Sequence, residues 1–290
     1  MKVGGAPATD GREHDMATTA DTATRPNSVR LTLWILLTVY VFNFIDRQIV
    51  NILAEPIARD LALNDTQIGL MTGLAFALFY TVLGIPLARY ADRQTTSRPR
   101  LIATALALWS AMTALCGLAN NFVQMALARI GVGVGEAGCT PAAHSLISDA
   151  VAPEKRASAI AFYGLGVPIG TLLGLVIGGV VNDIWGWRVA LMLVGVPGIL
   201  LALLLPLLMS EPRRLGLARG QAAAAGLPPM SAKAAFAEAF SSRAFLLLLL
   251  AASFAAFLSY GKGLWTISMF IRSHGLSTTQ AGSVSYTHLT

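Results

Sequence analysis

Seven apolar segments, each close to the length of a membrane-spanning helix, constrain the fold more than any other feature of the sequence. A helix needs about 20 predominantly apolar residues to cross the hydrocarbon core of a bilayer. Lipid offers no partners for backbone N–H and C=O groups, so these segments must be helical. We therefore predict an all-α, polytopic membrane protein. The segments are Leu31–Leu53, Gln67–Tyr90, Leu101–Ala119, Phe122–Ile147, Ala157–Val181, Arg188–Met209 and Ala244–Ile271.

The composition supports a membrane protein and argues against several other classes. Hydrophobic residues make up 55% of the 290 residues and charged residues 12%, whereas soluble domains carry about 25% charged residues. We find no Walker A loop, no nucleophile–base pair and no metal-ligand spacing, so we predict no enzyme activity, no cofactor and no metal site. Cys116 and Cys139 both lie in apolar segments and are predicted to be buried thiols.

The basic residues indicate how the chain is oriented. Fifteen Lys and Arg residues lie in the N-terminal tail and the even-numbered loops, against three in the odd-numbered loops, Arg59, Arg188 and Arg272. Cytoplasmic loops of membrane proteins carry the excess of Lys and Arg. We therefore expect a cytoplasmic N-terminus in a cell membrane. The net charge is +6, but the basic residues are distributed by loop, as membrane topology requires. We therefore predict no nucleic-acid partner.

The segments divide the chain into five parts. Residues 1–30 are expected to be a disordered cytoplasmic tail, 31–209 a six-helix bundle, and 210–243 a cytoplasmic linker. Residues 244–283 are expected to be the seventh helix and the start of a second bundle. The final residues 284–290, VSYTHLT, resemble read-through of a sequencing adapter and are excluded. We accordingly expect a natural protein that is longer by about five helices.

A short internal repeat supports two related halves. Leu63–Gly69 and Leu276–Gly282 both read L-x-x-T-Q-x-G, at an offset of 213 residues. The first follows the first apolar segment and the second follows the seventh. The seventh segment is thus expected to correspond to the first one in a second copy, and repeated halves are typical of secondary transporters.

Four charged residues lie well inside the first and fourth apolar segments, where a charge costs roughly 3 kcal/mol unless it faces a paired or wet interior. Asp46 and Arg47 are in the first segment, and Arg129 and Glu136, seven residues apart, share a face of the fourth. Counted from the ends of their segments, Asp46 and Arg129 lie at similar depths in the bilayer, which favours a contact between them. Arg47 is then able to reach Glu136. We predict a proton-coupling or substrate-binding site; the alternative is a static structural ion network.

Glycines mark the surfaces at which helices are expected to pack closely. In the fourth segment they lie on the face opposite the charged pair. In the fifth segment they recur at every fourth position beside Pro168 and form one stripe, which we interpret as a packing seam. The predicted packing glycines are Gly131, Gly135, Gly166, Gly170, Gly174 and Gly178.

The cytoplasmic end of the second segment carries a cluster of charges, including Asp92, Arg93 and Arg98. It is either a solvated basic loop or a charged gate at the inner side. In the seventh segment, Lys262 is placed where it could line a cavity, together with Tyr260 and Trp265.

Three motifs in these segments resemble the major facilitator superfamily, and within it the spinster-like branch. They are Asn-x-x-Asp-Arg at 43–47, Ala-Asp-Arg at 91–93, and Arg-x-Gly-x-Gly-x-Gly-Glu-Ala at 129–137. The second is similar to motif A, although Ala88 replaces its first glycine. The resemblance implies alternating access between two six-helix bundles, with substrate near the midplane. It also implies proton coupling at Asp46 and Glu136.

These observations lead to one preferred function and two alternatives. We predict a monomeric, proton-coupled secondary transporter that moves a small organic or lipid-like solute through the bilayer. A seven-helix receptor or sensor, and an uncoupled facilitative carrier, are the alternatives. The identity of the solute, the direction of transport, and the choice between symport and antiport stay open.

Overall fold

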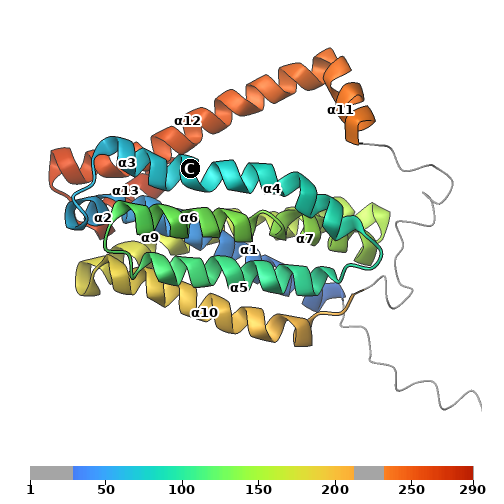
Figure 1. Ribbon diagram of the computed structural model, residues 1–290, viewed down its shortest axis with the longest axis horizontal. Helices are drawn as coiled ribbons and strands as arrows, with labels where there is room; N and C mark the ends of the chain where they lie inside the picture. The colour runs from blue at the N-terminus through green and yellow to red at the C-terminus, as the bar shows by residue number, and fades with distance from the viewer. Residues whose placement is uncertain (1–28, 212–231, 290) are drawn as a thin grey trace, which may run out of the picture.

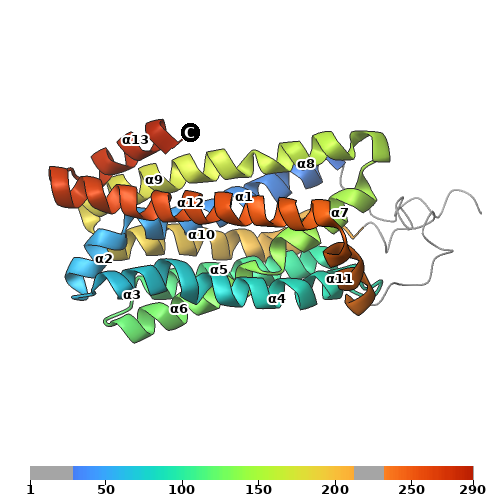
Figure 2. The same ribbon diagram turned by 90° about the horizontal axis from the view of Figure 1, so that it is seen from above.

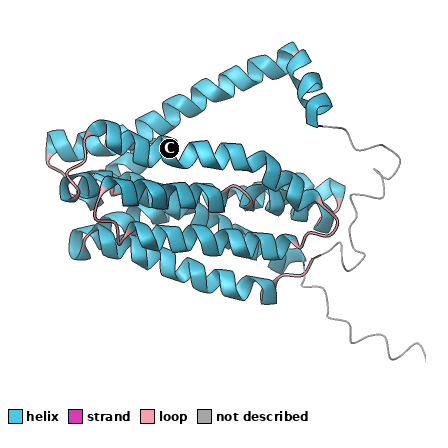
Figure 3. Cartoon of the chain, in the orientation of Figure 1, coloured by secondary structure: helices cyan, strands magenta, loops and turns pink. Residues whose placement is uncertain are grey.

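The computed structural model describes residues 29–211 and 232–289, and every regular element in these ranges is helical (Figures 1 and 3). The expected tail lies outside the described residues, as does most of the linker. The helices run along the long axis of the molecule. Among the described residues, six helical spans are long and apolar enough to cross a membrane. Some of these spans consist of consecutive elements that join without a break. The prediction of an all-α membrane protein is confirmed.

The elements follow one another in a simple order. They are α1 (Val29–Ile52), α2 (Ala54–Asp60), α3 (Asp65–Gly69), a π-helical stretch (Leu70–Leu74), α4 (Ala75–Asp92), α5 (Arg98–Cys116), α6 (Phe122–Glu136), α7 (Cys139–Ala150), a 3₁₀ turn (Pro153–Lys155), α8 (Arg156–Gly164), α9 (Gly166–Trp185), α10 (Trp187–Leu208), α11 (Ala232–Ser241), α12 (Arg243–His274) and α13 (Thr278–Leu289). We call α1 to α10 the first bundle.

The fourth apolar segment is not one uninterrupted helix, and in this detail the prediction is wrong. It divides into α6 and α7 at Ala137 and Gly138. Pro141 explains the break, because it has no N–H to donate to the carbonyl of Ala137 and its ring crowds that carbonyl. The break follows directly after Glu136, so this side chain lies at the end of a helix inside the bundle.

The glycine stripe of α9 lies against α1. A Cβ added at Gly170 would lie 2.6 Å from both the Phe44 Cβ and the Val41 carbonyl oxygen, and one at Gly174 would lie 2.9 Å from the Gln48 Cβ. Gly166 meets Tyr40 in the same way. Only glycine permits this approach, so the stripe sets the position of α1, the helix that carries Asp46 and Arg47.

The glycines of α6 face two other helices. Gly135 packs on the backbone of Trp109 in α5, and Gly131 packs on Met112 in the same helix. Gly133, which the sequence analysis did not single out, packs on Phe76 in α4. A Cβ added at Gly133 would lie 2.5 Å from the Phe76 carbonyl oxygen. Helix α6 is therefore held closely between α4 and α5.

The internal repeat has a structural role at two helix starts. The Asn64 side chain accepts from the Gln67 N–H at 2.9 Å, while the Gln67 side chain accepts from the Asn64 N–H at 3.0 Å. Ser277 and Gln280 make the same reciprocal pair, at 3.3 and 3.0 Å, at the start of α13. Each copy therefore forms a capping box, the first at the start of α3 and the second at the start of α13.

Helix α12 packs on the first bundle at one end only. Its buried residues, Leu264, Ile267, Ser268 and Ile271, all lie in its last third. Toward α11 it diverges from α4 and presents apolar side chains such as Phe257, which is 77% exposed (Figure 1). Viewed from above, α12 lies across the face of the first bundle (Figure 2). The described residues are thus closed together at the end near α2 and α3, and open at the other end.

The close contact between α9 and α1 leads to a prediction about stability. Gly170→Ala should destabilise the protein by about 1–3 kcal/mol, because the added methyl group meets backbone and Cβ atoms that cannot rotate away. Gly164→Ala is the matched control, since an added Cβ there meets nothing within 4 Å. Thermal unfolding in detergent checks this: equal midpoints for the two variants would contradict it.

Candidate functional site

The centre of the site is an ion pair between α1 and α6. Arg47 Nε donates to Glu136 Oε2 at 2.8 Å, and the Glu136 side chain is fully buried. The Arg47 guanidinium also lies 5.0 Å from the centre of the Phe76 ring and 4.7 Å from that of Tyr80, both on α4. Thus the expected Arg47–Glu136 contact is present, and aromatic faces surround its cation.

The expected Asp46–Arg129 contact is not formed, and this prediction is wrong for the conformation described. Both residues are buried, at 1% and 2% exposure, yet the described residues include no ion pair between them. The Arg129 guanidinium instead lies 5.2 Å from the centre of the Phe76 ring. Asp46 is placed toward Trp109 and Thr113 of α5, with Arg129 and Glu136 close enough to act on it electrostatically.

Phe76 is a residue of the site that the sequence analysis missed. Its ring lies next to the guanidiniums of both Arg47 and Arg129 and stacks on Tyr80, with 5.4 Å between ring centres. The two aromatics are four residues apart on one face of α4. That spacing is a weak signal, because aromatic pairs at helical spacing occur throughout apolar helices.

Several buried polar atoms around these charges have no hydrogen-bond partner among the described residues. Native proteins pair nearly all such atoms, so a cluster of exceptions marks a place for water, a proton or a ligand. The cluster comprises Asn43 Oδ1, both carboxylate oxygens of Asp46, Trp109 Nε1, Thr113 Oγ1, Arg129 Nε and one terminal nitrogen, and Glu136 Oε1.

A second charged network lies where α4, α5, α7 and the end of α10 meet, at the end of the bundle that the charge distribution predicts to be cytoplasmic and that we call the inner end. Arg98 is completely buried and contacts two acids: its side chain bonds Asp149 at 2.7 Å, and it also pairs with Glu211. Its backbone N–H donates to Glu211 as well, at 2.8 Å. Ser145 bridges the Arg98 guanidinium to Asp92. Arg98 is therefore not a solvated loop residue.

The other residue of the predicted gate is arranged differently. Arg93 is exposed, and its guanidinium lies 5.7 Å from the centre of the Tyr90 ring. The partners of Arg98 are residues of the first bundle and Glu211, which follows three residues after the end of α10. Glu211 was placed in the linker by the sequence analysis, which gave no reason to pair it with Arg98.

Ionic contacts at the opposite end, near α2 and α3, which we call the outer end, join α12 and α13 to the first bundle. Arg272 of α12 bonds Glu55 of α2 and Asp65 of α3, each at 2.6 Å. The Asp183 side chain of α9 accepts from the backbone N–H groups of Thr278 and Thr279 at 3.3 and 3.0 Å. These contacts account for the closed end of the structure.

A further outer arginine acts within the first bundle only. Arg188 at the start of α10 pairs with Asp60 at the end of α2, and the neighbouring Trp187 donates to the same carboxylate at 3.3 Å. The hydrogen bond from Arg188 lowers the pKa of Asp60 below its usual value.

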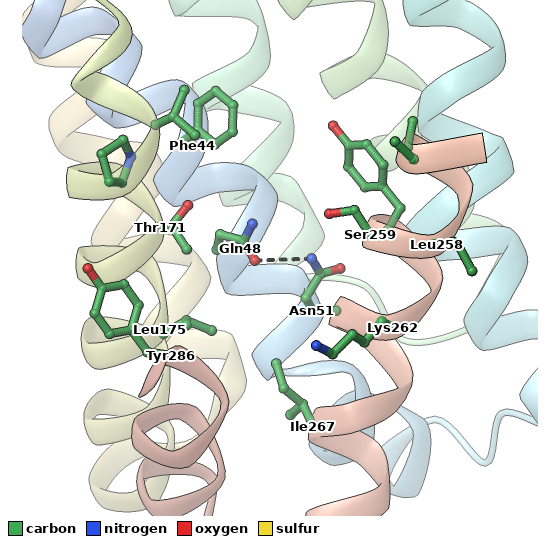
Figure 4. Close-up of a pocket in the computed structure, with 16 residues that line it drawn as sticks. Phe44, Gln48, Asn51, Thr171, Leu175, Leu258, Ser259, Lys262, Ile267 and Tyr286 are labelled. Atoms are coloured by element: carbon green, nitrogen blue, oxygen red, sulfur yellow. Dashed lines mark hydrogen bonds between the residues drawn. The ribbon is translucent and has the colours of Figure 1, made fainter. Parts of the chain in front are cut away.

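A cavity of about 830 Å³ lies between α1, α9 and α12 (Figure 4). Phe44, Gln48 and Asn51 line it from one face of α1, and Tyr260 and Lys262 line it from α12. Arg47 itself does not line the cavity, but it lies on α1 between the lining residues Phe44 and Gln48. The cavity has the size of a small-molecule site.

Comparison with known proteins identifies the family. The model of the Major Facilitator Superfamily matches residues 36–287. The chain belongs to the Major Facilitator Superfamily. It is 32% identical over 250 residues to an MFS-type efflux pump of Mycolicibacterium smegmatis, covering 86% of this chain and 56% of that protein. It is 31% identical over 183 residues to a probable L-galactonate transporter of Escherichia coli, covering 62% and 40%.

A solved structure supports the spinster-like resemblance within this superfamily. A bacterial homolog of the human lysosomal transporter Spinster, inward-facing and unoccupied, matches with a TM-score of 0.75 and 34% identity. The match covers 90% of this chain and 59% of that one. The chain spans about half the length of the curated relatives it matches. The family and the spinster-like resemblance predicted from the motifs are confirmed.

The buried network at the inner end yields a prediction about folding. Arg98→Ala should destabilise the protein by about 3–5 kcal/mol, because Asp149 and Glu211 would be left buried without their cation. Arg100→Ala, two residues away and exposed, is the control and should be close to neutral. Thermal unfolding in detergent measures both; a mild effect of Arg98→Ala would contradict the assigned role.

The outer contacts yield a prediction about conformation. Arg272→Ala should increase the population in which α12 has separated from α2 and α3, because Arg272 joins α12 to both helices. A cysteine introduced at the buried Ile267 would report this through labelling by an impermeant maleimide. We expect labelling at least about five-fold faster, which corresponds to about 1 kcal/mol.

The control for this experiment is Arg188→Ala, because Arg188 pairs with Asp60 inside the first bundle. The two native cysteines are buried and contribute little background. If both arginine variants change the labelling rate equally, the contacts of Arg272 do not hold the outer end closed.

Proposed function

We propose that this protein is a proton-coupled secondary transporter that moves a small organic solute by alternating access. The observation that supports this most strongly is the incompletely paired set of Asp46, Arg47, Arg129 and Glu136 inside apolar helices, of which Asp46, Arg129 and Glu136 are buried. A purely structural ion network would be expected to pair its members fully, since each unpaired buried charge is costly.

Asp46 is the proposed site at which a proton is taken up and released. Its carboxylate lies beside Trp109 and Thr113 without a well-formed hydrogen bond to either, and protonation removes the charge that burial penalises. Arg129 lies nearby over the Phe76 ring. In our proposal, movement of Arg129 from Phe76 to Asp46 stabilises the carboxylate and releases the proton. Proton exchange is thereby linked to a change in helix packing.

Glu136 has a complementary part in this proposal. One oxygen accepts from Arg47, whereas Oε1 has no partner in the described part of the chain. Arg47 is on the same helix as cavity residues Phe44 and Gln48. A solute that enters the cavity can thus alter the Arg47–Glu136 pair, and through it the charge balance around Asp46.

The open and closed ends support alternating access. The outer end is held by the contacts of Arg272 and Asp183, while the inner part of α12 diverges from the first bundle. The start of α1, the end of α10 and the start of α12 lie at this open end (Figure 1). With the positive-inside distribution of charge, this arrangement supports a cytoplasmic N-terminus in the cell membrane. Of the residues predicted as an inner gate, Asp92 and Arg93 are proposed to act there directly, while Arg98, paired inside the first bundle, is proposed to hold the end of α5 that supports them.

The substrate class is proposed from the relatives. One of them is named as an L-galactonate transporter, whose solute is a carboxylate, and another as an efflux pump. We propose a small organic or lipid-like solute, carried by a monomer without a cofactor. An uncoupled carrier is the second candidate, and the experiment below distinguishes it from the first.

The test is solute uptake into proteoliposomes containing the protein expressed from its complete reading frame. With an imposed proton gradient, Asp46→Asn and Glu136→Gln should reduce gradient-driven uptake at least about ten-fold, while downhill solute exchange persists. Glu154→Gln, an exposed acid at the inner surface, is the control. Proton coupling is refuted if both site variants retain gradient-driven uptake at the level of the unaltered protein. An unaltered protein that ignores the gradient would favour the uncoupled carrier.

A further inference from the structure

Lys262 is a cation without a counterion in the described part of the chain. It lies on α12, ten residues before Arg272 at the outer end, or about 15 Å along the helix axis. That places it deep in the bilayer, where a lysine costs roughly 3 kcal/mol on insertion scales. The expected location of this residue against a cavity is observed, and its side chain is exposed among the described residues, so a ligand in the cavity can reach it.

The cavity around Lys262 carries no compensating charge. Among its lining residues, all within the described ranges, Lys262 is the only one with a formal charge. In Figure 4 its amine points away from α12 into the space in front of α1. The neighbouring Arg47 is already paired with Glu136. An empty cavity therefore carries one net positive charge that a ligand can neutralise.

Hydrogen-bond donors from α1 lie on the facing wall. Asn51 Nδ2 donates to Gln48 Oε1 at 3.3 Å, which leaves the Gln48 amide NH₂ without an acceptor among the described residues. Thr171 and Ser259 add hydroxyl groups to the same cavity. An ammonium group and neutral donors on opposite walls form a suitable surface for a carboxylate or a phosphate monoester.

The remaining walls are apolar. Phe44, Leu175, Leu258 and Ile267 line the cavity around the polar residues. A fully hydrated, highly charged ion would leave these surfaces unmatched, whereas a solute with one anionic group and an organic body would cover them.

We propose that Lys262 is the residue that recognises the anionic group of the transported solute, with Gln48 and Asn51 as neutral donors. The substrate class is therefore an organic anion with a single anionic group, either a small carboxylate or the phosphate of a single-chain lipid. This inference rests on the proposed transport function and adds the chemistry of the ligand. It also explains why a lysine is retained in an apolar helix.

The test is ligand-induced thermal stabilisation of the protein expressed from its complete reading frame, which requires no transport. Three matched pairs of probes are used: galactonate with galactitol, benzoate with benzamide, and dodecyl phosphate with dodecanol. The anionic member of at least one pair should stabilise the unaltered protein more than its uncharged partner. The pair that responds separates a small carboxylate from a lipid phosphate.

Lys262→Gln should weaken the response to that anion at least about ten-fold in apparent Kd, whereas Lys262→Arg should retain it. Lys155→Gln, at the inner surface, is the control. Removing a charge from an apolar helix lowers its insertion cost, so Lys262→Gln should fold at least as well as the unaltered protein. A lower unfolding temperature without ligand, together with unchanged anion binding, would mean that Lys262 pairs with an acid of the protein, and would overturn the proposal.

Two further results separate this inference from the proposed function. If Lys262→Gln still drives uptake of the same anion with an unchanged KM, transport stands and the assignment of Lys262 fails. If anions bind through Lys262 but no gradient drives their uptake, the binding site stands and proton coupling fails. Preferential stabilisation by the uncharged members of all three pairs would also refute the anion site.

Discussion

The cost of burying charge in hydrocarbon governs this structure. Each charged side chain inside the first bundle must find a partner there, because neither lipid nor bulk water supplies one. Arg98 meets the requirement fully, with Asp149 and Glu211 around it. Arg47 meets it with Glu136 and the aromatic rings of α4. Asp46 and Arg129 do not pair with each other, although both are buried, and our proposed function rests on this difference from Arg98.

The positions of the charges depend on close helix packing. Gly170 and Gly174 allow α9 to contact the backbone of α1, while Gly133 and Gly135 hold α6 against α4 and α5. This packing brings Arg47 of α1 and Glu136 of α6 together, although they are 89 positions apart in the sequence. The Arg47 Nε and Glu136 Oε2 atoms are 2.8 Å apart. The break after Glu136 adds a local irregularity at the same depth, where a helix can change its packing with little loss of hydrogen bonding.

The two ends of the molecule differ in the way their charges are shared. At the inner end, the contacts of Arg98 remain within the first bundle and with Glu211, so they stabilise that bundle as a unit. At the outer end, Arg272 and Asp183 connect α12 and α13 to it. Contacts between units respond to their relative movement, whereas contacts within a unit do not. Closure at one end and separation at the other follow from this distribution.

The sequence by itself determined the helical class, the approximate spans, the family and the charged residues that lie inside the apolar helices. The hydrocarbon core requires helices of a certain length and polarity, and both properties can be read directly from the order of the residues. The L-x-x-T-Q-x-G repeat likewise encoded two local capping boxes. Only the tertiary structure decided the partners: Arg129 faces Phe76 instead of Asp46, and Glu211 joins Arg98. Helix rotation and side-chain reach select among partners of equal charge and similar depth, and neither quantity is written in the order of the residues.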